Sequence, residues 1–385
     1  MKRLPAALTI FLMTCALAFA QVEDIRNPSI NTETEQGSLI SQAGTAEDDA
    51  TRMQLLETFV ERYSDHDAIN YVYLQLQGLH LAAGNFDEVI SYGEKLIEAV
   101  PEDVEIRQNL TKGYEGKQDF DSLLPHLLAT RPYAEKDTQL PEPEYEDEVE
   151  AWQAQIDYAK GVLQYIEYSL YASLFKITDP AKKIEYMDAL RELYPEGQYA
   201  GVLDDYYVQS YQQLGDVAKM LAAMEAAVQK NPGNENYLFT LAESSVRQAQ
   251  YDKAKGYAEQ LIQVMNQKAK PENQTEEEWT KNKELFSAYG NYMLGKLTVL
   301  QAGNAAQGYR DGRKQLLTTV GPIQERGGEH YGILAYMLGI CYVKLDIAGD
   351  NIGQATKWMG IAAKEPNPYQ GEAQNTLAAI RAATE

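Results

Sequence analysis

The chain has 385 residues with 57 acidic and 34 basic side chains, so its formal net charge at pH 7 is −23. A surface this acidic repels nucleic-acid phosphates and anionic lipid headgroups, so we expect no nucleic-acid partner. A single hydrophobic core stops growing near about 250–300 residues. The length therefore predicts either two domains or an elongated array.

Residues 1–20 have the pattern of a cleaved signal peptide. Lys2 and Arg3 precede an apolar run over residues 8–19, and Ala20 ends an Ala-Phe-Ala sequence that favours cleavage after it. No later stretch approaches the roughly 20 apolar residues that span a bilayer. The sequence therefore predicts a periplasmic or secreted protein that does not span a membrane, and we expect the polar residues 21–48 to be disordered.

Residues 49–131 contain the clearest helical hairpin. Apolar residues predict one helix over 71–83 and a second over 86–99, and Gly84-Asn85 forms a turn between them. Pro101 prevents the second helix from continuing. The same pattern of turn, helix-breaking and apolar residues recurs 131 residues later. The matching pairs are Tyr63 and Tyr194, Gly84 and Gly215, Pro101 and Pro232, Leu110 and Leu241, and Asp121 and Asp252.

This pattern of residues at the helix turns and ends resembles that of the tetratricopeptide repeat (TPR) family, whose units are helical hairpins of about 34 residues. Four units fit the pattern, over residues 70–103, 104–131, 201–234 and 235–272. Two degenerate units each contain Tyr-Met-Leu-Gly, ending at Gly295 and Gly339, and the second has an irregular turn over residues 346–351. The resemblance implies an all-α fold: a right-handed α-solenoid of roughly six or seven TPR-like hairpins.

Other segments interrupt or end this array. Residues 132–150 are acidic and contain several prolines, which predicts an exposed connector, and residues 151–272 continue the hairpins with a long Tyr-rich helix over about 148–177. Thr275 and Glu278 form a capping box that starts a helix at Glu276. Degenerate hairpins should occupy 273–366, and a capping helix and tail 367–385. We expect Gly295 and Gly339 to lie where the two helices of their hairpins come closest.

No set of residues indicates catalysis, a metal site or a cofactor. The four histidines do not form a pair one helical turn apart. Cys341 lies in an apolar helical context, where a free cysteine behaves as a small hydrophobe. Of the 27 tyrosines, four fall at positions where the repeat family packs aromatic side chains, namely Tyr114, Tyr211, Tyr251 and Tyr342. For Tyr71, Tyr158, Tyr165, Tyr168 and Tyr206, packing and binding remain equally open.

The resemblance predicts a non-catalytic scaffold that binds a protein or peptide on its concave face. In the family the first helices of successive units line that face, which implies the groove positions Tyr71, Leu74, Gly78, Gln108, Lys112, Asp205, Gln209, Gln212, Asn236, Phe239 and Glu243. Lys112 is the only cation among them, so the partner should be neutral or basic. The alternative is an enzyme or enzyme subunit that acts on glycan or peptidoglycan through a Tyr-rich pocket. A convergent carboxylate pair in a closed pocket would favour it.

Overall fold

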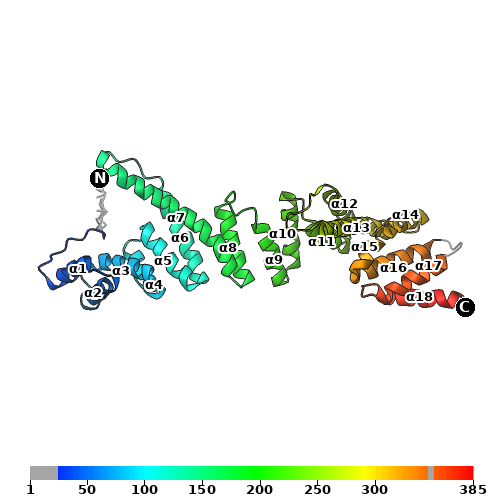
Figure 1. Cartoon of the computed structure of the whole chain (residues 1–385), viewed down its shortest axis with the longest axis horizontal. Coiled ribbons are helices and arrows are strands. Elements are labelled where there is room, and N and C mark those ends of the chain that lie inside the picture. The colour runs from blue at the N-terminus through cyan, green and yellow to red at the C-terminus, as the bar shows by residue number, and fades with distance from the viewer. Residues whose placement is uncertain (1–24, 346–350, 385) are drawn as a thin grey trace, which may run out of the picture. The chain divides into compact units, whose positions relative to one another are not determined.

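The computed structural model describes residues 25–345 and 351–384, and this part of the chain is all-α and contains no strand (Figure 1). The predicted signal peptide and residues 346–350 of the predicted turn lie outside the described residues. The chain divides into two compact units, unit 1 (residues 1–200) and unit 2 (residues 201–385). The predicted all-α array of helical hairpins is confirmed.

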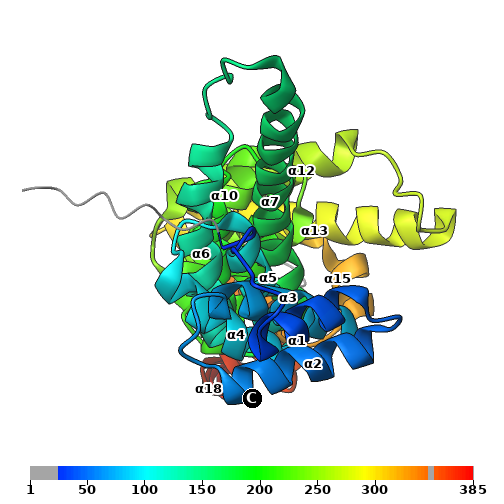
Figure 2. The ribbon, with the colours of Figure 1, turned by 90° about the vertical axis from the view of Figure 1, so that its left-hand side faces the viewer.

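Unit 1 consists of four consecutive hairpins among its described residues, in which α1 packs on α2, α3 on α4, α5 on α6 and α7 on α8. Neighbouring hairpins also touch, and Figure 2 shows α1 and α2 beside α3. The helices are α1 (Glu35–Thr45), α2 (Asp49–Arg62), α3 (Ile69–Ala83), α4 (Phe86–Ala99), α5 (Val104–Lys117), α6 (Phe120–Asp137), the 3₁₀ turn η1 (Glu146–Glu148), α7 (Val149–Lys176) and α8 (Pro180–Leu193).

Unit 2 has four hairpins in its described part, α9 with α10, α11 with α12, α13 with α14 and α16 with α17, while α15 and α18 are single helices. The predicted capping helix is present as α18, which packs on α17 and buries Ala373. The helices are α9 (Leu203–Leu214), α10 (Val217–Lys230), α11 (Glu235–Arg247), α12 (Tyr251–Gln267), α13 (Glu276–Gln301), α14 (Ala306–Leu317), α15 (Val320–Arg326), α16 (Glu329–Lys344), α17 (Asn351–Ala362) and α18 (Gln370–Thr384).

The residues that recur at a spacing of 131 occupy equivalent places in the two units. Gly84 and Gly215 end α3 and α9 in the left-handed conformation, with φ of 75° and 71°, which glycine adopts without steric cost. Tyr63 and Tyr194 end α2 and α8. The paired leucines at 110 and 241 are both buried in the first helix of their hairpins. The repeat inferred from the sequence is therefore a repeat of structure.

Local capping signals determine several helix ends, and the capping box predicted at Thr275 is confirmed. The Thr275 side chain accepts a hydrogen bond from the Glu278 backbone N–H at 3.2 Å, and the Glu278 carboxylate accepts one from the Thr275 N–H at 2.8 Å. Helix α13 therefore begins at Glu276. Asp179 caps α8 through the Ala181 N–H at 3.0 Å, with Pro180 as the first helical residue.

The two glycines of the Tyr-Met-Leu-Gly sequences lie at close helix approaches, as predicted. A Cβ added to Gly295 of α13 would lie 2.9 Å from Leu316 Cγ of α14. A Cβ added to Gly339 of α16 would lie 2.9 Å from Met359 Cε of α17. Carbon atoms at these separations clash, so any side chain at either glycine would force the facing Leu316 or Met359 side chain to shift.

The prediction that residues 21–48 are disordered is wrong for the described residues from 25 onward. Thr34 caps α1 by accepting a hydrogen bond from the Gly37 N–H, and Ile40 and Ala43 are buried against Leu56 and neighbouring apolar residues. The segment has too few apolar residues to show a helical period by itself. The fold orders it because α2 supplies the complementary apolar surface.

The predicted connector over residues 132–150 is shorter than expected. Helix α6 continues through Pro132 to Asp137, and Thr130 and Ala134 on its inner face are buried. Proline removes one helical hydrogen bond, but packing of α6 against both α5 and α7 outweighs this loss. The non-helical connector therefore starts only at residue 138 and ends at η1.

The boundary between the compact units also differs from the predicted segments. The sequence suggested one set of hairpins over 151–272, whereas the contacts place α7 and α8 with unit 1 and start unit 2 at Gly201. Helix α7 packs on both α5 and α6, so it completes the N-terminal array. No helix in the described part of the chain is both long enough and apolar enough to cross a membrane.

Candidate binding site

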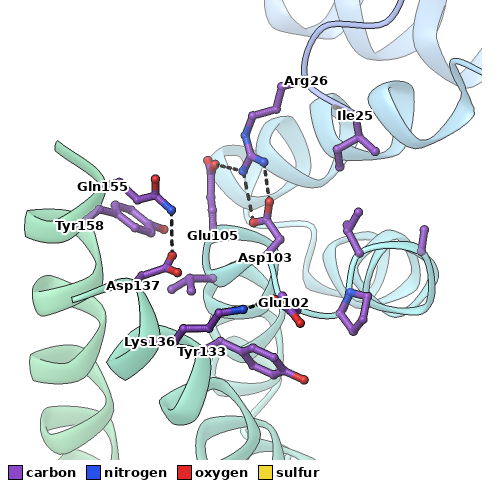
Figure 3. Close-up of a pocket in the computed structure, with 14 residues that line it drawn as sticks. Ile25, Arg26, Glu102, Asp103, Glu105, Tyr133, Lys136, Asp137, Gln155 and Tyr158 are labelled. Atoms are coloured by element: carbon purple, nitrogen blue, oxygen red, sulfur yellow. Dashed lines mark hydrogen bonds and ion pairs between the residues drawn. The ribbon is translucent and has the colours of Figure 1, made fainter. Parts of the chain in front are cut away.

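Unit 1 contains a pocket of about 810 Å³ where four parts of the chain meet (Figure 3). These parts are the N-terminal segment at Ile25 and Arg26, the turn from α4 into α5, the last turns of α6 and the first half of α7. The lining residues are Ile25, Arg26, Ala99, Val100, Pro101, Glu102, Asp103, Val104, Glu105, Tyr133, Lys136, Asp137, Gln155 and Tyr158.

Two carboxylates at the start of α5 hold the guanidinium of Arg26. Arg26 Nη1 donates to Asp103 Oδ2, and Nη2 donates to Asp103 Oδ1 at 3.2 Å and to Glu105 Oε2 at 2.8 Å (Figure 3). The hydrogen bonds that Arg26 donates to Asp103 are the largest of the effects that raise the pKa of Arg26 above its ordinary value. Both terminal nitrogens therefore engage Asp103, and Nη2 also engages Glu105, an arrangement suited to a planar guanidinium.

The Asp103 carboxylate is positioned independently of Arg26. Its Oδ1 accepts a hydrogen bond at 3.0 Å from the Ile106 N–H, which caps α5. Arg107 Nε donates to the Pro101 carbonyl and so fixes the turn before α5. The positive end of the helix dipole also favours negative charge at these positions. Asp103 and Glu105 form the acidic edge of the pocket. The position of this edge is fixed by the start of α5, whose backbone Asp103 caps.

The opposite walls come from α6 and α7. Lys136 Nζ pairs with Glu102 at 2.6 Å, and Gln155 Nε2 donates to Asp137 Oδ2 at 3.1 Å. The Tyr158 hydroxyl donates to Gln108 Oε1 at 2.7 Å. Burial, followed by the nearby carboxylates, raises the pKa of Tyr158 to about 12, so the hydroxyl stays protonated. The pocket thus presents a neutral aromatic wall opposite an acidic edge.

The predicted groove residues of unit 1 do not form one open surface. Tyr71 and Leu74 on α3 are half-buried, and Gly78 on the same helix is exposed. Gln108 is buried, because α7 covers α5 and Tyr158 bonds its amide oxygen. Lys112 Nζ donates to the same oxygen at 3.2 Å, and burial lowers its pKa.

Helix α7 thus covers part of the face that the resemblance had implied to be open. It lies over α5 because Tyr165 and Ser169 bond to Glu115, at 3.0 Å and 3.5 Å, and Lys176 pairs with the same carboxylate. Gln108 and Lys112 are therefore structural partners of α7 in this fold.

In unit 2 the predicted residues of α9 and the first of α11 are exposed. These are Asp205, Gln209, Gln212 and Asn236. The Asp205 carboxylate accepts a hydrogen bond from the Tyr237 hydroxyl at 2.7 Å, which joins the two helices. The other three side chains are open to solvent.

The remaining predicted residues, Phe239 and Glu243, enter an aromatic and ionic cluster on α11, α13 and α16. Phe239 stacks on Tyr289 with ring centroids 4.3 Å apart, and its centroid is 5.2 Å from that of His330. His330 Nε2 lies 3.1 Å from Glu243 Oε1. Burial opposes ionisation of Glu243, but His330 and the charges of nearby Lys296 and Arg247 outweigh it and lower the pKa of Glu243.

The described residues offer no group of three or more acidic, His or Cys side chains that could hold a metal ion. Each carboxylate of the unit 1 pocket already bonds to a side chain, since Glu102 pairs with Lys136, Asp137 accepts from Gln155, and the remaining two hold Arg26. These contacts give no support to the enzyme alternative, which needs one carboxyl group as acid and another as base or nucleophile.

The chief polar contacts of this pocket were not predicted from the sequence. Arg26 lies in a segment predicted to be disordered, and Asp103 and Glu105 were not among the predicted groove residues. One signal was present, because Arg26 is the only Lys or Arg between residues 21 and 51. An isolated cation in an acidic segment is a candidate for pairing with a distant carboxylate.

No protein-family model and no curated protein matches the sequence. Among solved structures, the chain is similar to a tetratricopeptide repeat protein from Parabacteroides merdae, with 10% identity, a TM-score of 0.27 and coverage of 80% of this chain and 98% of that one. It is also similar to the TPR domain of P58(IPK), with 12% identity, a TM-score of 0.29 and coverage of 91% and 99%. It is also similar to yeast Tom70, with 12% identity, a TM-score of 0.25 and coverage of 92% of this chain and 89% of that one.

Two of these three structures are named as tetratricopeptide repeat structures, the family that the sequence resembles. Likeness at such low identity and TM-score does not indicate a shared function. The hairpin architecture rests instead on the helix pairing and turn chemistry of this chain.

Proposed function

We propose that this protein is a non-catalytic scaffold that binds a neutral or basic protein or peptide segment, and that the unit 1 pocket is a binding site. The observation that supports the proposal is that Asp103 and Glu105 already hold a basic side chain from a non-helical stretch of polypeptide. A partner segment would present the same chemistry.

The properties of the pocket suit a polypeptide ligand. Its volume of about 810 Å³ lies within the range of about 300–1,000 Å³ that is usual for ligand sites. Tyr133 and Tyr158 offer aromatic surface, and the amide of Gln155 and the carboxylates offer polar contacts. The net charge of −23 favours encounter with a neutral or basic partner over an acidic one.

We further propose that the protein acts outside the cytoplasm, since residues 1–20 have the pattern of a cleaved signal. The exposed side chains of α9 and α11, Gln209, Gln212 and Asn236, are proposed as a separate contact surface of unit 2. They are neutral amides, which can bond to peptide backbone on an extended segment.

The test is selection of a phage-displayed random dodecapeptide library on the chain from Gln21 onward, followed by fluorescence-anisotropy titration of the enriched peptides. The pocket variant is the double substitution Asp103→Asn and Glu105→Gln, in which the asparagine introduced at position 103 can still cap α5. The control is Asp179→Asn, which alters the cap of α8 outside the pocket.

We expect the double variant to weaken binding at least about tenfold, because charge-assisted bonds to the ligand are lost. The control should bind like the unaltered chain. Added salt should weaken binding, and amidating the peptide C-terminus should change the affinity by less than about threefold, because the acidic edge offers no site for a terminal carboxylate. Failure to enrich any peptide, or equal binding by the double variant, would overturn the proposal.

A further inference from the structure

Two contacts of the N-terminal segment with the helices of unit 1 differ in character. At one end Arg26 reaches the pocket. At the other end Ile30 packs on the apolar cluster of α1, α2 and α3, and the Asn31 carbonyl lies against Gly37 of α1. A Cβ at Gly37 would be only 2.0 Å from that carbonyl oxygen, so this second attachment is a close backbone contact.

The attachment at Arg26 is the exchangeable one. The side chains of Arg26 and Glu105 are 43% and 48% exposed, so water competes with their ion pair. Asp103 is less exposed, at 13%, and its bond to the Ile106 N–H keeps its carboxylate in place whether or not Arg26 is bound. Arg26 can therefore leave while the segment stays docked through Ile30 and Asn31, and the receiving carboxylate keeps its position.

The pocket has room for more than Arg26. Its volume of about 810 Å³ is measured with Ile25 and Arg26 already in its wall. The space beside them is bounded by Tyr133, Gln155 and Tyr158, and the last two are held by their bonds to Asp137 and Gln108. An incoming side chain can thus reach the acidic edge along the aromatic wall.

We propose that Arg26 is an intramolecular occupant of the site and that the partner displaces it with an arginine of its own. The proposal rests on the function proposed above and specifies the partner chemistry. Arginine fits better than lysine, because a planar guanidinium spans Asp103 and Glu105 with two separate nitrogens, as Arg26 does, whereas an ammonium is a single point of charge.

Self-occupancy has a defined effect on affinity. A ligand that needs the free site binds with an apparent affinity reduced by the fraction of molecules in which the site is free. Arg26→Gln removes the charge of the competitor and should tighten binding of an arginine peptide by at least about threefold. Arg26→Lys keeps the charge but loses the planar guanidinium, so it should tighten peptide binding less than Arg26→Gln does.

The experiment uses the dodecapeptide library, selected on the Arg26→Gln chain and counter-selected on the Asp103→Asn, Glu105→Gln double variant. The best arginine-containing peptide is then titrated against each chain, together with versions in which its arginine is replaced by lysine or glutamine. Arg62→Gln is the matched control: it removes one positive charge from an exposed ion pair with Glu35, outside the pocket. Circular dichroism checks that all variants are folded.

The expected order of affinity is Arg26→Gln above Arg26→Lys above the unaltered chain, with Arg62→Gln equal to the unaltered chain. Replacing the peptide arginine with glutamine should abolish the advantage of Arg26→Gln. If the double variant loses binding but Arg26→Gln binds no more tightly than Arg62→Gln, self-occupancy is refuted and the proposed function stands.

Two other results would also be decisive. Enriched peptides that bind the pocket without any arginine refute the stated partner chemistry and leave the scaffold function intact. If counter-selection on the double variant removes every peptide that binds the Arg26→Gln chain, the pocket is refuted as the site, and the self-occupancy inference with it.

Discussion

Gly312→Ala should destabilise unit 2, because α13 and α14 cross there with glycine on both helices. A Cβ at Gly312 would lie 2.6 Å from Val299 Cγ2, 3.2 Å from the Gly295 carbonyl oxygen and 3.3 Å from the Val299 backbone nitrogen. Two of these three neighbours are backbone atoms of α13 and cannot rotate away. The methyl group can be accommodated only if the helices separate.

The magnitude follows from two opposing effects. Overpacking of this kind costs about 1–3 kcal/mol, whereas alanine is a better helix former than glycine by about 0.8–1 kcal/mol. The net loss in the free energy of unfolding should therefore be about 1 kcal/mol, up to about 2. Gly256→Ala in α12 is the matched control, because a Cβ there meets nothing within 4 Å. It should gain about 0.5–1 kcal/mol from helix propensity alone.

The assay is urea unfolding followed by tryptophan fluorescence. Trp279 and Trp358 belong to unit 2 and Trp152 to unit 1, so a Trp152→Phe background restricts the signal to unit 2. With a slope of about 1–3 kcal/mol per molar urea, the two glycine variants should shift the midpoint in opposite directions by a few tenths of a molar or more. If Gly312→Ala is as stable as Gly256→Ala, the crossing is not tight and the reasoning is wrong.

Four further outcomes are expected. Leu241→Ala should cost about 2–5 kcal/mol in urea unfolding, since the side chain is 2% exposed, and a loss below about half a kilocalorie would mean that α11 is misplaced. His330 lowers the pKa of Glu243 below its ordinary 4.5. The ionised Glu243 carboxylate therefore stabilises the folded chain above pH 4.5, and this stabilisation is lost as the pH falls through the lowered pKa. Glu243→Gln should therefore lower the free energy of unfolding at neutral pH, and the variant and the unaltered chain should be equally stable in acid. An equal loss of stability at neutral and at acidic pH would contradict the ion pair between Glu243 and His330. Burial raises the pKa of the Cys341 thiol to about 12, so a thiol-reactive dye should label it only after unfolding, and rapid labelling of the folded chain would show that α16 opens. The net charge of −23 predicts no saturable binding to DNA or anionic vesicles at physiological salt in a gel-shift or sedimentation assay, and such binding would reveal a local basic patch.

Where a local signal exists, the sequence predicted the structure well. Gly84 and Gly215 predicted turns, and the capping box at Thr275 predicted the first residue of α13. Each signal acts within a few residues, through a backbone conformation or a cap that has few alternatives. The close approach at Gly339 was also predictable, because a glycine inside an apolar helix has few explanations other than packing.

The sequence failed where burial reverses a local preference. Pro132 weakens a helix by itself, yet α6 continues through it because Thr130 and Ala134 are buried. Helix α1 has a weak apolar pattern and forms against α2. The groove assigned by family resemblance was likewise incomplete, since a long α7 lies over Gln108.

The sequence by itself thus determined that the chain is an all-α array of hairpins, where several of its helices begin and end, and that its net charge is −23. Only the tertiary structure decided the candidate site. Arg26 and Asp103 are 77 residues apart, and Tyr158 and Gln108 are 50 apart. No periodicity or cap links such residues along the chain. Their contact results from the stacking of successive hairpins and from the length of α7, which depend on the summed packing of many side chains rather than on any local pattern.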